Sequence, residues 1–334
     1  MYVNCQNIGK GLYFPMFWHI LKSERKKRER NMKQEFYEKL CEILREEGQV
    51  LLDEPLKKHT TFRIGGPAKY FCLPGTWEEL TAVIRACREF EESYYILGNG
   101  SNILASDQGY SGVVIQIFQN RNEIRIEGTR LYVDAGALLV KASHLAAREG
   151  LTGLEFASGI PGTIGGALVM NAGAYGGEMK DVVQEALVLT EDGEQLRLSG
   201  EQLELGYRTS SIARQRQIVL EAVLELKQGD KTSIEARMKE LKEARTEKQP
   251  LEYPSAGSTF KRPEGYFAGK LIMDAGLRGF RVGDAQVAEK HCGFLINRGD
   301  AAAEDVLALV SHVQKEVRNQ FGVELELEVK LLGF

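Results

Sequence analysis

The most informative stretch of this chain is Gly159-Ile160-Pro161-Gly162-Thr163-Ile164-Gly165-Gly166-Ala167, which is followed by the glycine-rich stretch Asn171-Ala172-Gly173-Ala174-Tyr175-Gly176-Gly177. Glycine has no Cβ, so a backbone rich in it can bring its amides close to an anionic ligand. We interpret this region as a phosphate-handling loop.

A second glycine-rich turn, Gly98-Asn99-Gly100-Ser101-Asn102, follows the apolar run Tyr94–Leu97, which has the length and β propensity of a buried strand. Two such turns indicate one extended ligand. The chain has no Walker loop, and Ile103 stands where a dinucleotide fingerprint needs its third glycine, so a P-loop or Rossmann site is not expected.

The composition is that of an ordinary globular protein of two or three domains, with 334 residues, 43% of them hydrophobic and 27% charged. The net charge of −4 provides no general basic field for nucleic acid, although residues 261–281 are locally basic. The five cysteines are scattered and the five histidines show no ligand spacing, which argues against disulfides and a metal site. A reducing cytoplasm fits this cysteine usage best.

The N-terminal residues 1–31 are interpreted as a dispensable extension. Their apolar part, Gly11 to Leu21, has 11 residues, whereas a bilayer needs about 20. We therefore expect no stable membrane association, with a weak surface anchor as the alternative. Met32 directly precedes an amphipathic stretch and is a candidate for the true start.

The hydrophobic periodicity predicts mixed helices and strands in an α+β arrangement. We expect helices over 32–47, 76–87, 138–149 and 302–321, and a further helix that begins after residue 229. Gly48 is expected as the C-cap of the first helix, Thr76 in a capping box of the second, and Thr232 or Ser233 as the N-cap of the helix after 229. In the last helix, Phe321 is expected to point inward. Strands are expected over 69–73, 94–97, 112–117, 121–126, 130–135, 185–190, 195–198, 217–226 and 323–332.

Three polar residues lie in segments where chemistry would be expected, but each also has a plain structural interpretation. Arg208 follows Tyr207 in a polar link and is typical of a surface arginine. Ser258 lies in a small-residue loop that is typical of a turn. Glu328 alternates with apolar residues on the last strand, a pattern typical of the wet face of a sheet.

Taken together and in order, seven segments resemble the UDP-N-acetylenolpyruvoylglucosamine reductases, flavoenzymes that complete UDP-N-acetylmuramate for bacterial peptidoglycan. These segments are Thr61–Ala68, Gly98–Leu104, Gly153–Gly177, Tyr207–Ser210, Ala256–Phe260, His291–Asn297 and Leu325–Gly333. The chain has no long insertion between Gly177 and Tyr207, so it resembles the shorter branch of the family.

The resemblance implies a two-part FAD-binding region of the vanillyl-alcohol-oxidase (PCMH) type over 32–228, with subdomains of about 32–105 and 106–228. An α+β substrate-binding domain over 229–334 would follow. FAD is expected to be non-covalent, because the loop Gly98–Asn102 has no histidine or cysteine. The expected FAD-binding residues are Arg63, Gly65, Gly98, Asn99, Gly100, Ser101, Asn102, Gly159, Ile160, Pro161, Gly162, Thr163, Ile164, Gly165 and Gly166.

The family's chemistry implies that NADPH reduces FAD, and that UDP-N-acetylglucosamine enolpyruvate then takes its place as the second substrate. By resemblance, Arg208 would hold the substrate carboxylate, Glu328 would act as an acid toward the enolate, and Ser258 would donate the proton to the other alkene carbon. We also expect a cytoplasmic protein that is a monomer or a weak oligomer. The candidates for substrate binding are Tyr207, Lys261, Lys270 and His291.

Two other functions stay open at this point. One is a flavin-dependent sugar or lactone oxidase on the same scaffold, which the lack of a covalent flavin anchor disfavours. The other is a non-catalytic nucleotide-binding or regulatory protein, which the joint presence of Arg208, Ser258 and Glu328 disfavours.

Overall fold

The structure is a computed structural model, and it describes residues 31–118 and 120–334. The proposed extension and its apolar segment, together with Cys5, therefore lie outside the described residues, apart from residue 31. A helix over 31–43 begins the described part and ends earlier than the sequence predicts. Gly48, expected as its cap, lies in the turn before the first strand with a φ of 85°.

The first unit contains a four-stranded sheet with the order β1-β2-β5-β3, and helix α2 connects two of its strands. Thr76 caps α2 as predicted, because its hydroxyl accepts from the amide of Glu79 at 3.1 Å. In the chain, the short 3-10 helix η1 lies between β1 and β2, and the short strand β4 lies between β3 and β5. The bounds are β1 Val50–Pro55, η1 Leu56–Lys58, β2 Pro67–Cys72, α2 Trp77–Glu89, β3 Tyr94–Leu97, β4 Ile103–Ala105 and β5 Tyr110–Gln116.

The second unit contains an antiparallel five-stranded sheet with the order β12-β11-β13-β7-β6. All the strands predicted between 121 and 226 are present here. The sheet strands are β6 Ile124–Glu127, β7 Arg130–Asp134, β11 Val183–Leu189, β12 Gln195–Ser199 and β13 Ile218–Glu225. The other elements are α3 Leu139–Arg148, β8 Leu151–Thr152, η2 Glu155–Ala157, α4 Ile164–Val169, β9 Gly173–Ala174, β10 Gly177–Glu178, η3 Met179–Asp181 and α5 Ser211–Arg214.

The third unit follows β14 Lys227–Gln228 and begins with the long helix α6 (Lys231–Lys248). Asp230 caps this helix, with its carboxylate accepting from the amide of Ser233 at 2.8 Å, so neither Thr232 nor Ser233 is the N-cap. A four-stranded sheet with the order β15-β18-β17-β16 shares a hydrophobic core with the helices α7 and α8. The bounds are β15 Ser255–Ser258, α7 Ala268–Asp274, β16 Arg281–Val282, β17 Ala285–Val287, β18 Phe294–Asn297, α8 Ala303–Phe321 and β19 Lys330–Leu332.

Three expectations for the C-terminal region are wrong. Phe321 is exposed rather than inward, and the last strand covers only β19 instead of 323–332. The segment before β19 makes a single bridge, between Leu327 and Phe260, and then Glu328 turns into the interior with only 9% exposure. The loop expected at Ser258 is likewise strand β15.

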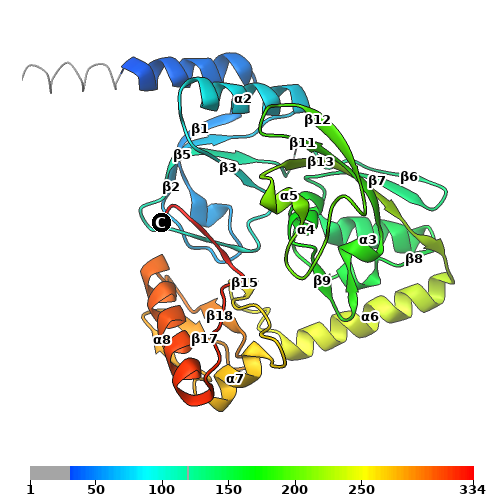
Figure 1. Cartoon of the computed structure of the whole chain (residues 1–334), viewed down its shortest axis with the longest axis vertical. Helices are drawn as coiled ribbons and strands as arrows, with labels where there is room; N and C mark the ends of the chain where they lie inside the picture. The colour runs from blue at the N-terminus through cyan, green and yellow to red at the C-terminus, as the bar shows by residue number, and fades with distance from the viewer. Residues whose placement is uncertain (1–30, 119) are drawn as a thin grey trace, which may run out of the picture.

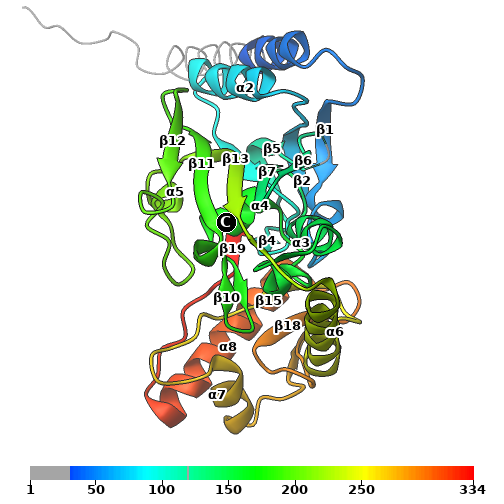
Figure 2. The same cartoon turned by 90° about the vertical axis from the view of Figure 1, so that its right-hand side faces the viewer.

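The C-terminal strand ties the third unit back to the first. β19 pairs in parallel with β4, and Figure 1 shows this red strand running from the orange third unit up to the blue and cyan first unit. Phe62, Ile64 and Leu104 of the first unit belong to the hydrophobic core of the third. The first two units share a separate core that includes Phe36, Ile115 and Leu220. Figure 2 shows the third unit below the other two.

Candidate functional site

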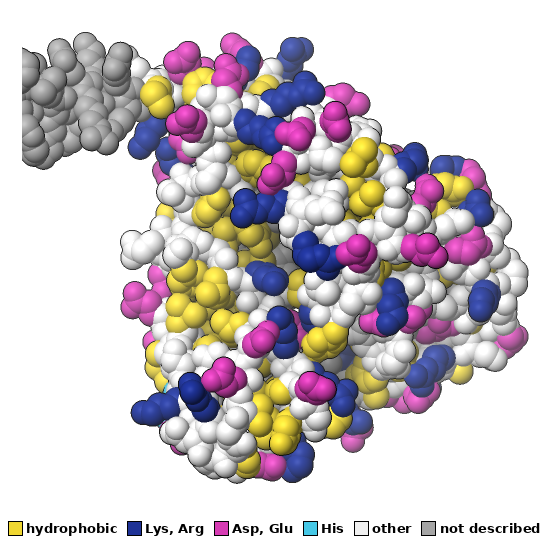
Figure 3. Space-filling view, in the orientation of Figure 1, with side chains coloured by type: hydrophobic (Ala, Val, Ile, Leu, Met, Phe, Trp, Pro, Cys, Tyr) yellow, Lys and Arg dark blue, Asp and Glu magenta, His cyan; other side chains and the backbone are white. Residues whose placement is uncertain are grey.

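One large cavity, of about 1880 Å³, lies among the three units. It is lined by both glycine-rich loops, by part of α6 and by the segments that carry Arg208, Ser258 and Glu328. The space-filling view shows a recess near the middle of the face in Figure 1, with Lys and Arg side chains at its margin (Figure 3).

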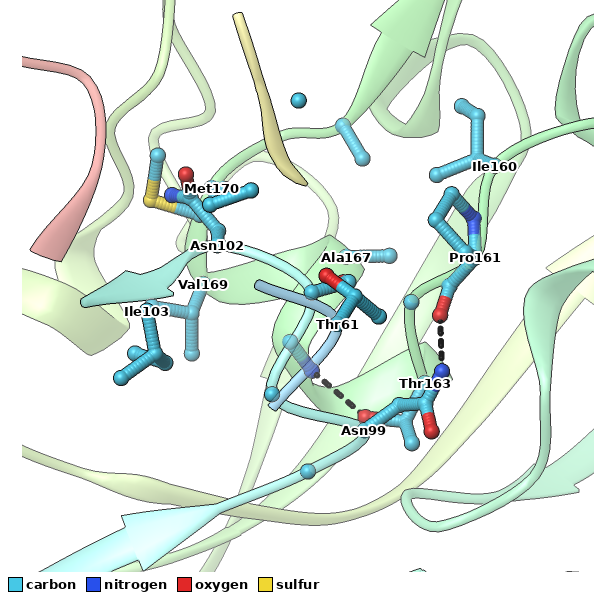
Figure 4. A pocket seen from close by; sticks show the side chains of 18 of the residues that line it. Thr61, Asn99, Asn102, Ile103, Ile160, Pro161, Thr163, Ala167, Val169 and Met170 are labelled. Carbon is cyan, nitrogen blue, oxygen red and sulfur yellow. Dashed lines mark hydrogen bonds between the residues drawn. The ribbon is translucent and has the colours of Figure 1, made fainter. Parts of the chain in front are cut away.

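At one end, the two glycine-rich loops face each other. The Asn99 side chain donates to the carbonyl of Pro161 at 2.5 Å, which joins the loop after β3 to the loop before α4 (Figure 4). A Cβ on Gly98 would lie 2.5 Å from the Thr163 hydroxyl oxygen, so only glycine permits this approach. Gly100 has a φ of 61°, and a Cβ there would lie 2.0 Å from the carbonyl oxygen of His59.

Most of the predicted FAD-binding residues line this cavity, and the exceptions have a clear local reason. Gly65 and Ile164 do not line it. A Cβ on Gly65 would meet those of Ala105 and Leu56, so this glycine serves a close packing contact. Ile164 is fully buried, and its amide donates to the carbonyl of Ala137 at 2.8 Å. Gly165 lines the cavity, but its amide already donates to Ala135 at 2.8 Å.

At the other end, the half-buried Arg208 pairs with the buried Glu328, although the two residues are 120 positions apart. The Nε of Arg208 donates to the Oε1 of Glu328 at 2.5 Å. Burial raises the pKa of Glu328, and the neighbouring Arg208 guanidinium lowers it, with burial the larger effect. Arg208 also has a φ of 54°, a left-handed conformation that is strained for a residue with a Cβ.

Ser258 is held beside Glu328 through the backbone. The amide of Glu328 donates to the carbonyl of Thr259 at 2.9 Å, and Ser258 is the last residue of β15. The Asn102 side chain donates to the carbonyl of Glu328 at 3.2 Å, so a residue of the first glycine loop holds the same segment. The structure thus brings Ser258, Arg208 and Glu328 to the cavity that the glycine loops line.

The four predicted substrate-binding residues do not line the cavity. Tyr207 accepts from the amide of Arg262 at 2.9 Å, whereas Lys261 pairs with Glu326 and Lys270 pairs with Asp274. His291 accepts from the amide of Gly293 at 3.1 Å, and burial lowers its pKa. Contact of these residues with a substrate therefore stays a prediction.

Five cations that the sequence analysis did not select line the cavity, namely Arg216, Lys239, Lys242, Arg245 and Lys330. Arg245 packs against Gly159, where a Cβ would lie 2.5 Å from its Nη1, and burial lowers the pKa of the guanidinium. A signal for it was present in the sequence. Arg245 continues the helical stripe of Ile234, Met238 and Leu241, so it lies on the buried face of α6.

The comparisons with known proteins agree with this arrangement. Residues 249–332 match a family model described as UDP-N-acetylenolpyruvoylglucosamine reductase, C-terminal domain, and residues 68–199 match one described as FAD binding domain. A UDP-N-acetylenolpyruvoylglucosamine reductase of Clostridium tetani is 52% identical over 303 residues, which cover 91% of this chain and 98% of the relative. One of Caldanaerobacter subterraneus is 51% identical over 89% of this chain and 97% of its own.

This chain belongs to the UDP-N-acetylenolpyruvoylglucosamine reductase family. The crystal structure of a family member from Thermus caldophilus, 40% identical, superposes with a TM-score of 0.74 and covers 85% of this chain and 98% of that one. The expected fold class, an FAD-binding region followed by an α+β C-terminal domain, is confirmed. The chain is an oxidoreductase of this family with FAD as its cofactor, whereas the exact domain boundaries stay a prediction.

Neither a metal-binding cluster nor a membrane-spanning helix is found in the described part of the chain. Among its residues, no group of three or more His, Cys, Asp or Glu side chains could hold a metal ion. Of the helices over 31–118 and 120–334, none is both long and apolar enough to cross a membrane.

Proposed function

We propose that this protein catalyses the NADPH-dependent reduction of UDP-N-acetylglucosamine enolpyruvate to UDP-N-acetylmuramate, a step of peptidoglycan precursor synthesis. One observation carries the proposal. Arg208, Ser258 and Glu328 come from three distant segments and line one cavity together with two glycine loops. The family membership and the match to the FAD binding domain support the same activity.

The glycine-loop end of the cavity fits FAD. Its walls combine apolar side chains such as Ile117 with bare backbone at Gly98, Gly100 and Gly162, a combination suited to a flat ring joined to a diphosphate. Bound FAD would supply the redox chemistry, because it can accept a hydride from NADPH and deliver a hydride to the terminal alkene carbon of the substrate. Non-covalent attachment is part of the proposal.

The residues at the other end fit the charge that develops on the substrate. Reduction of the alkene leaves an enolate conjugated with the carboxylate, and Arg208 provides a fixed cation for that charge. Glu328 would act as an acid toward the enolate, since burial favours its protonated form. Ser258 would deliver the proton to the carbon next to the carboxylate, which completes the saturated lactyl group. Because the enolate is a strong base, a weakly acidic hydroxyl at a short fixed distance can serve.

The anionic sugar nucleotide requires cations elsewhere in the cavity. Arg245 and Lys330 line it, whereas Lys261 and Lys270 are occupied by carboxylates outside it. We therefore assign Arg245 and Lys330 as additional candidates for the diphosphate, beside the contacts expected from the resemblance at Tyr207, Lys261, Lys270 and His291.

The deciding experiment follows NADPH oxidation by the purified protein with the enolpyruvyl sugar nucleotide. UDP-N-acetylglucosamine and buffer are the controls. We expect rapid oxidation with the enolpyruvyl compound only. Oxidation in all three samples would indicate an oxidase on this fold, and no oxidation in any would favour a binding protein.

A further inference from the structure

Asn171 lies at a helix end where glycine is the usual residue. The amide of Ala172 donates to the carbonyl of Ala167 at 2.8 Å and that of Asn171 to Leu168 at 3.2 Å, which is the Schellman arrangement at the end of α4. Asn171 has a φ of 43°, so its backbone is in the left-handed region. A side chain at this position is not required to end the helix.

The side chain of Asn171 is fully buried and uses its polar atoms to join three segments. Its Nδ2 donates to the carbonyl of Gly206 at 3.0 Å and to the Oε2 of Glu178 at 2.8 Å. Its Oδ1 accepts from the amide of Lys180 at 3.0 Å. The end of α4, the hairpin of β9 and β10, and the link before α5 are thereby joined.

The segment that Asn171 holds is the turn that carries Arg208. Gly206 and Thr209 pair with each other across the turn, and Arg208 lies between them in its left-handed conformation. The Arg208 Nη2 also donates to the carbonyl of Gly173 in the hairpin at 3.5 Å. Asn171 itself does not line the cavity, although its neighbours Met170 and Ala172 do.

We propose that Asn171 is a positioning residue for Arg208, fixing the turn 206–209 against the hairpin 173–178 so that the guanidinium meets Glu328. The hydrogen bond from Asn171 to Gly206 holds the turn to which Arg208 belongs. The hydrogen bond from Asn171 to Glu178 holds the hairpin that Arg208 contacts at Gly173. Its fully buried polar side chain, at a position suited to glycine, is explained by this role. The proposal rests on the role proposed for Arg208, and its first test does not require the reductase activity.

The first test uses Asn171→Gly, which removes the side chain and is compatible with the left-handed backbone. The carboxyl carbon of Glu328 is titrated by carbon-13 NMR and assigned by its loss in Glu328→Gln. Arg208, Lys261 and Lys330 all lower the pKa of Glu328, with Arg208 the largest of the three. We expect a higher pKa for Glu328 in Asn171→Gly, because the Arg208 guanidinium would move away from the Glu328 carboxylate while Glu328 stays buried. An unchanged pKa would overturn the proposal.

The second test is a double-mutant cycle on kcat per bound FAD, with Arg208→Ala as the other substitution. We expect Asn171→Gly to lower kcat by about tenfold in the wild-type background, since small misplacements of a catalytic group are costly, and by less than about twofold when Arg208 is absent. Equal losses in both backgrounds would mean that Asn171 acts independently of Arg208. If the wild type shows no reductase activity, the proposed function fails while the NMR titration still decides this inference.

Matched variants separate positioning from general stability. Ser143 is also buried, and its hydroxyl donates to the carbonyl of Leu154 at 2.7 Å away from the cavity lining. Ser143→Ala should lower the melting temperature without moving the pKa of Glu328 or kcat. Asn171→Ser leaves a smaller void and is the second variant. Failure of both Asn171 variants to fold would place the residue in stability alone and overturn the proposal.

Discussion

The two ends of the cavity are built in different ways. The glycine-loop end consists of backbone from two short local stretches, and its geometry depends on the absence of side chains at positions such as Gly98 and Gly100. The other end consists of side chains, Arg208, Ser258 and Glu328, that come from segments 50 to 120 residues apart. A local composition can specify the first end, whereas the second exists only when the three units are assembled.

The largest effect is expected at the glycine-loop end, from Gly100→Ala. The new Cβ would lie 2.0 Å from the backbone carbonyl of His59, and backbone cannot give way as a side chain can. We expect a loss of more than about 4 kcal/mol in the free energy of unfolding, the range of severe core defects, with little flavin retained. Urea unfolding and the absorbance of bound flavin measure both.

Gly128→Ala is the matched control for that substitution. Gly128 has a φ of 62°, and a Cβ there would meet nothing within 4 Å, so only the conformational cost of about 1 kcal/mol applies. A similar loss of unfolding free energy in Gly100→Ala and Gly128→Ala would show that the close approach of the backbone at Gly100 does not determine the structure of the glycine-loop end.

At the other end, Arg208→Ala should lower kcat by about 100- to 1000-fold, the typical cost of removing one preorganised charge-stabilising donor. Flavin reduction by NADPH should continue, because the missing cation acts on the sugar nucleotide. Stopped-flow absorbance of the flavin separates the two half-reactions. Arg214→Ala is the control, since Arg214 is an exposed arginine paired with Glu204 outside the cavity lining.

An Arg208→Ala variant that merely fails to hold FAD would contradict the division between the two ends. In that case Arg208 would have a structural role in the cofactor site. The flavin content of each purified variant therefore has to be measured before its kinetics.

The same contrast explains how much of the molecule the sequence predicts. Tyr94–Leu97 is a strand with the predicted bounds, and Thr76 caps its helix, because an apolar run and a capping hydroxyl act within a few residues. The glycine loops can be predicted for the same reason, because the clustering of glycines within a few residues is visible in the sequence itself.

Glu328 could not be placed from its own segment. The alternation of Glu324, Glu326 and Glu328 with apolar residues indicates an exposed face, and the structure leaves Glu324 and Glu326 exposed while burying Glu328. The difference arises from Arg208 and Asn102, which contact Glu328 from segments more than 100 residues away. Only the family resemblance selected it. Arg245 was missed although its helical spacing from Leu241 placed it on a buried face.

The protonation of Glu328 predicts a pH dependence for the end of the cavity formed by Arg208, Ser258 and Glu328, here called the side-chain end. Burial raises its pKa, so the protonated form persists to higher pH than in a free glutamate. If it acts as the acid, kcat is highest below this pKa and falls as pH rises through it. Glu328→Gln should lower kcat and remove that limb of the kcat profile. A limb that is still present in the variant would belong to another group.

The smallest effect concerns the joint between the units. Ala302, the residue before α8, has no side chain able to cap the helix, and Asp107 of the first unit accepts from the amides of Ala303 at 2.9 Å and Glu304 at 3.3 Å. Asp107→Ala should reduce the free energy of unfolding by about 1 kcal/mol, a typical value for a lost cap. It should also lower kcat modestly, because the third unit that carries Ser258 loses a tie to the first.

Asp230→Ala provides the comparison for that joint, since Asp230 caps α6 within its own segment. Urea unfolding should show a similar loss for the two variants, whereas kcat should fall only in Asp107→Ala. Equal kcat values would mean that the pairing of β19 with β4 and the shared core around Phe62 already fix the units. Assembly of the side-chain end would then depend on the sheet and the core, and the helix cap would contribute to stability alone.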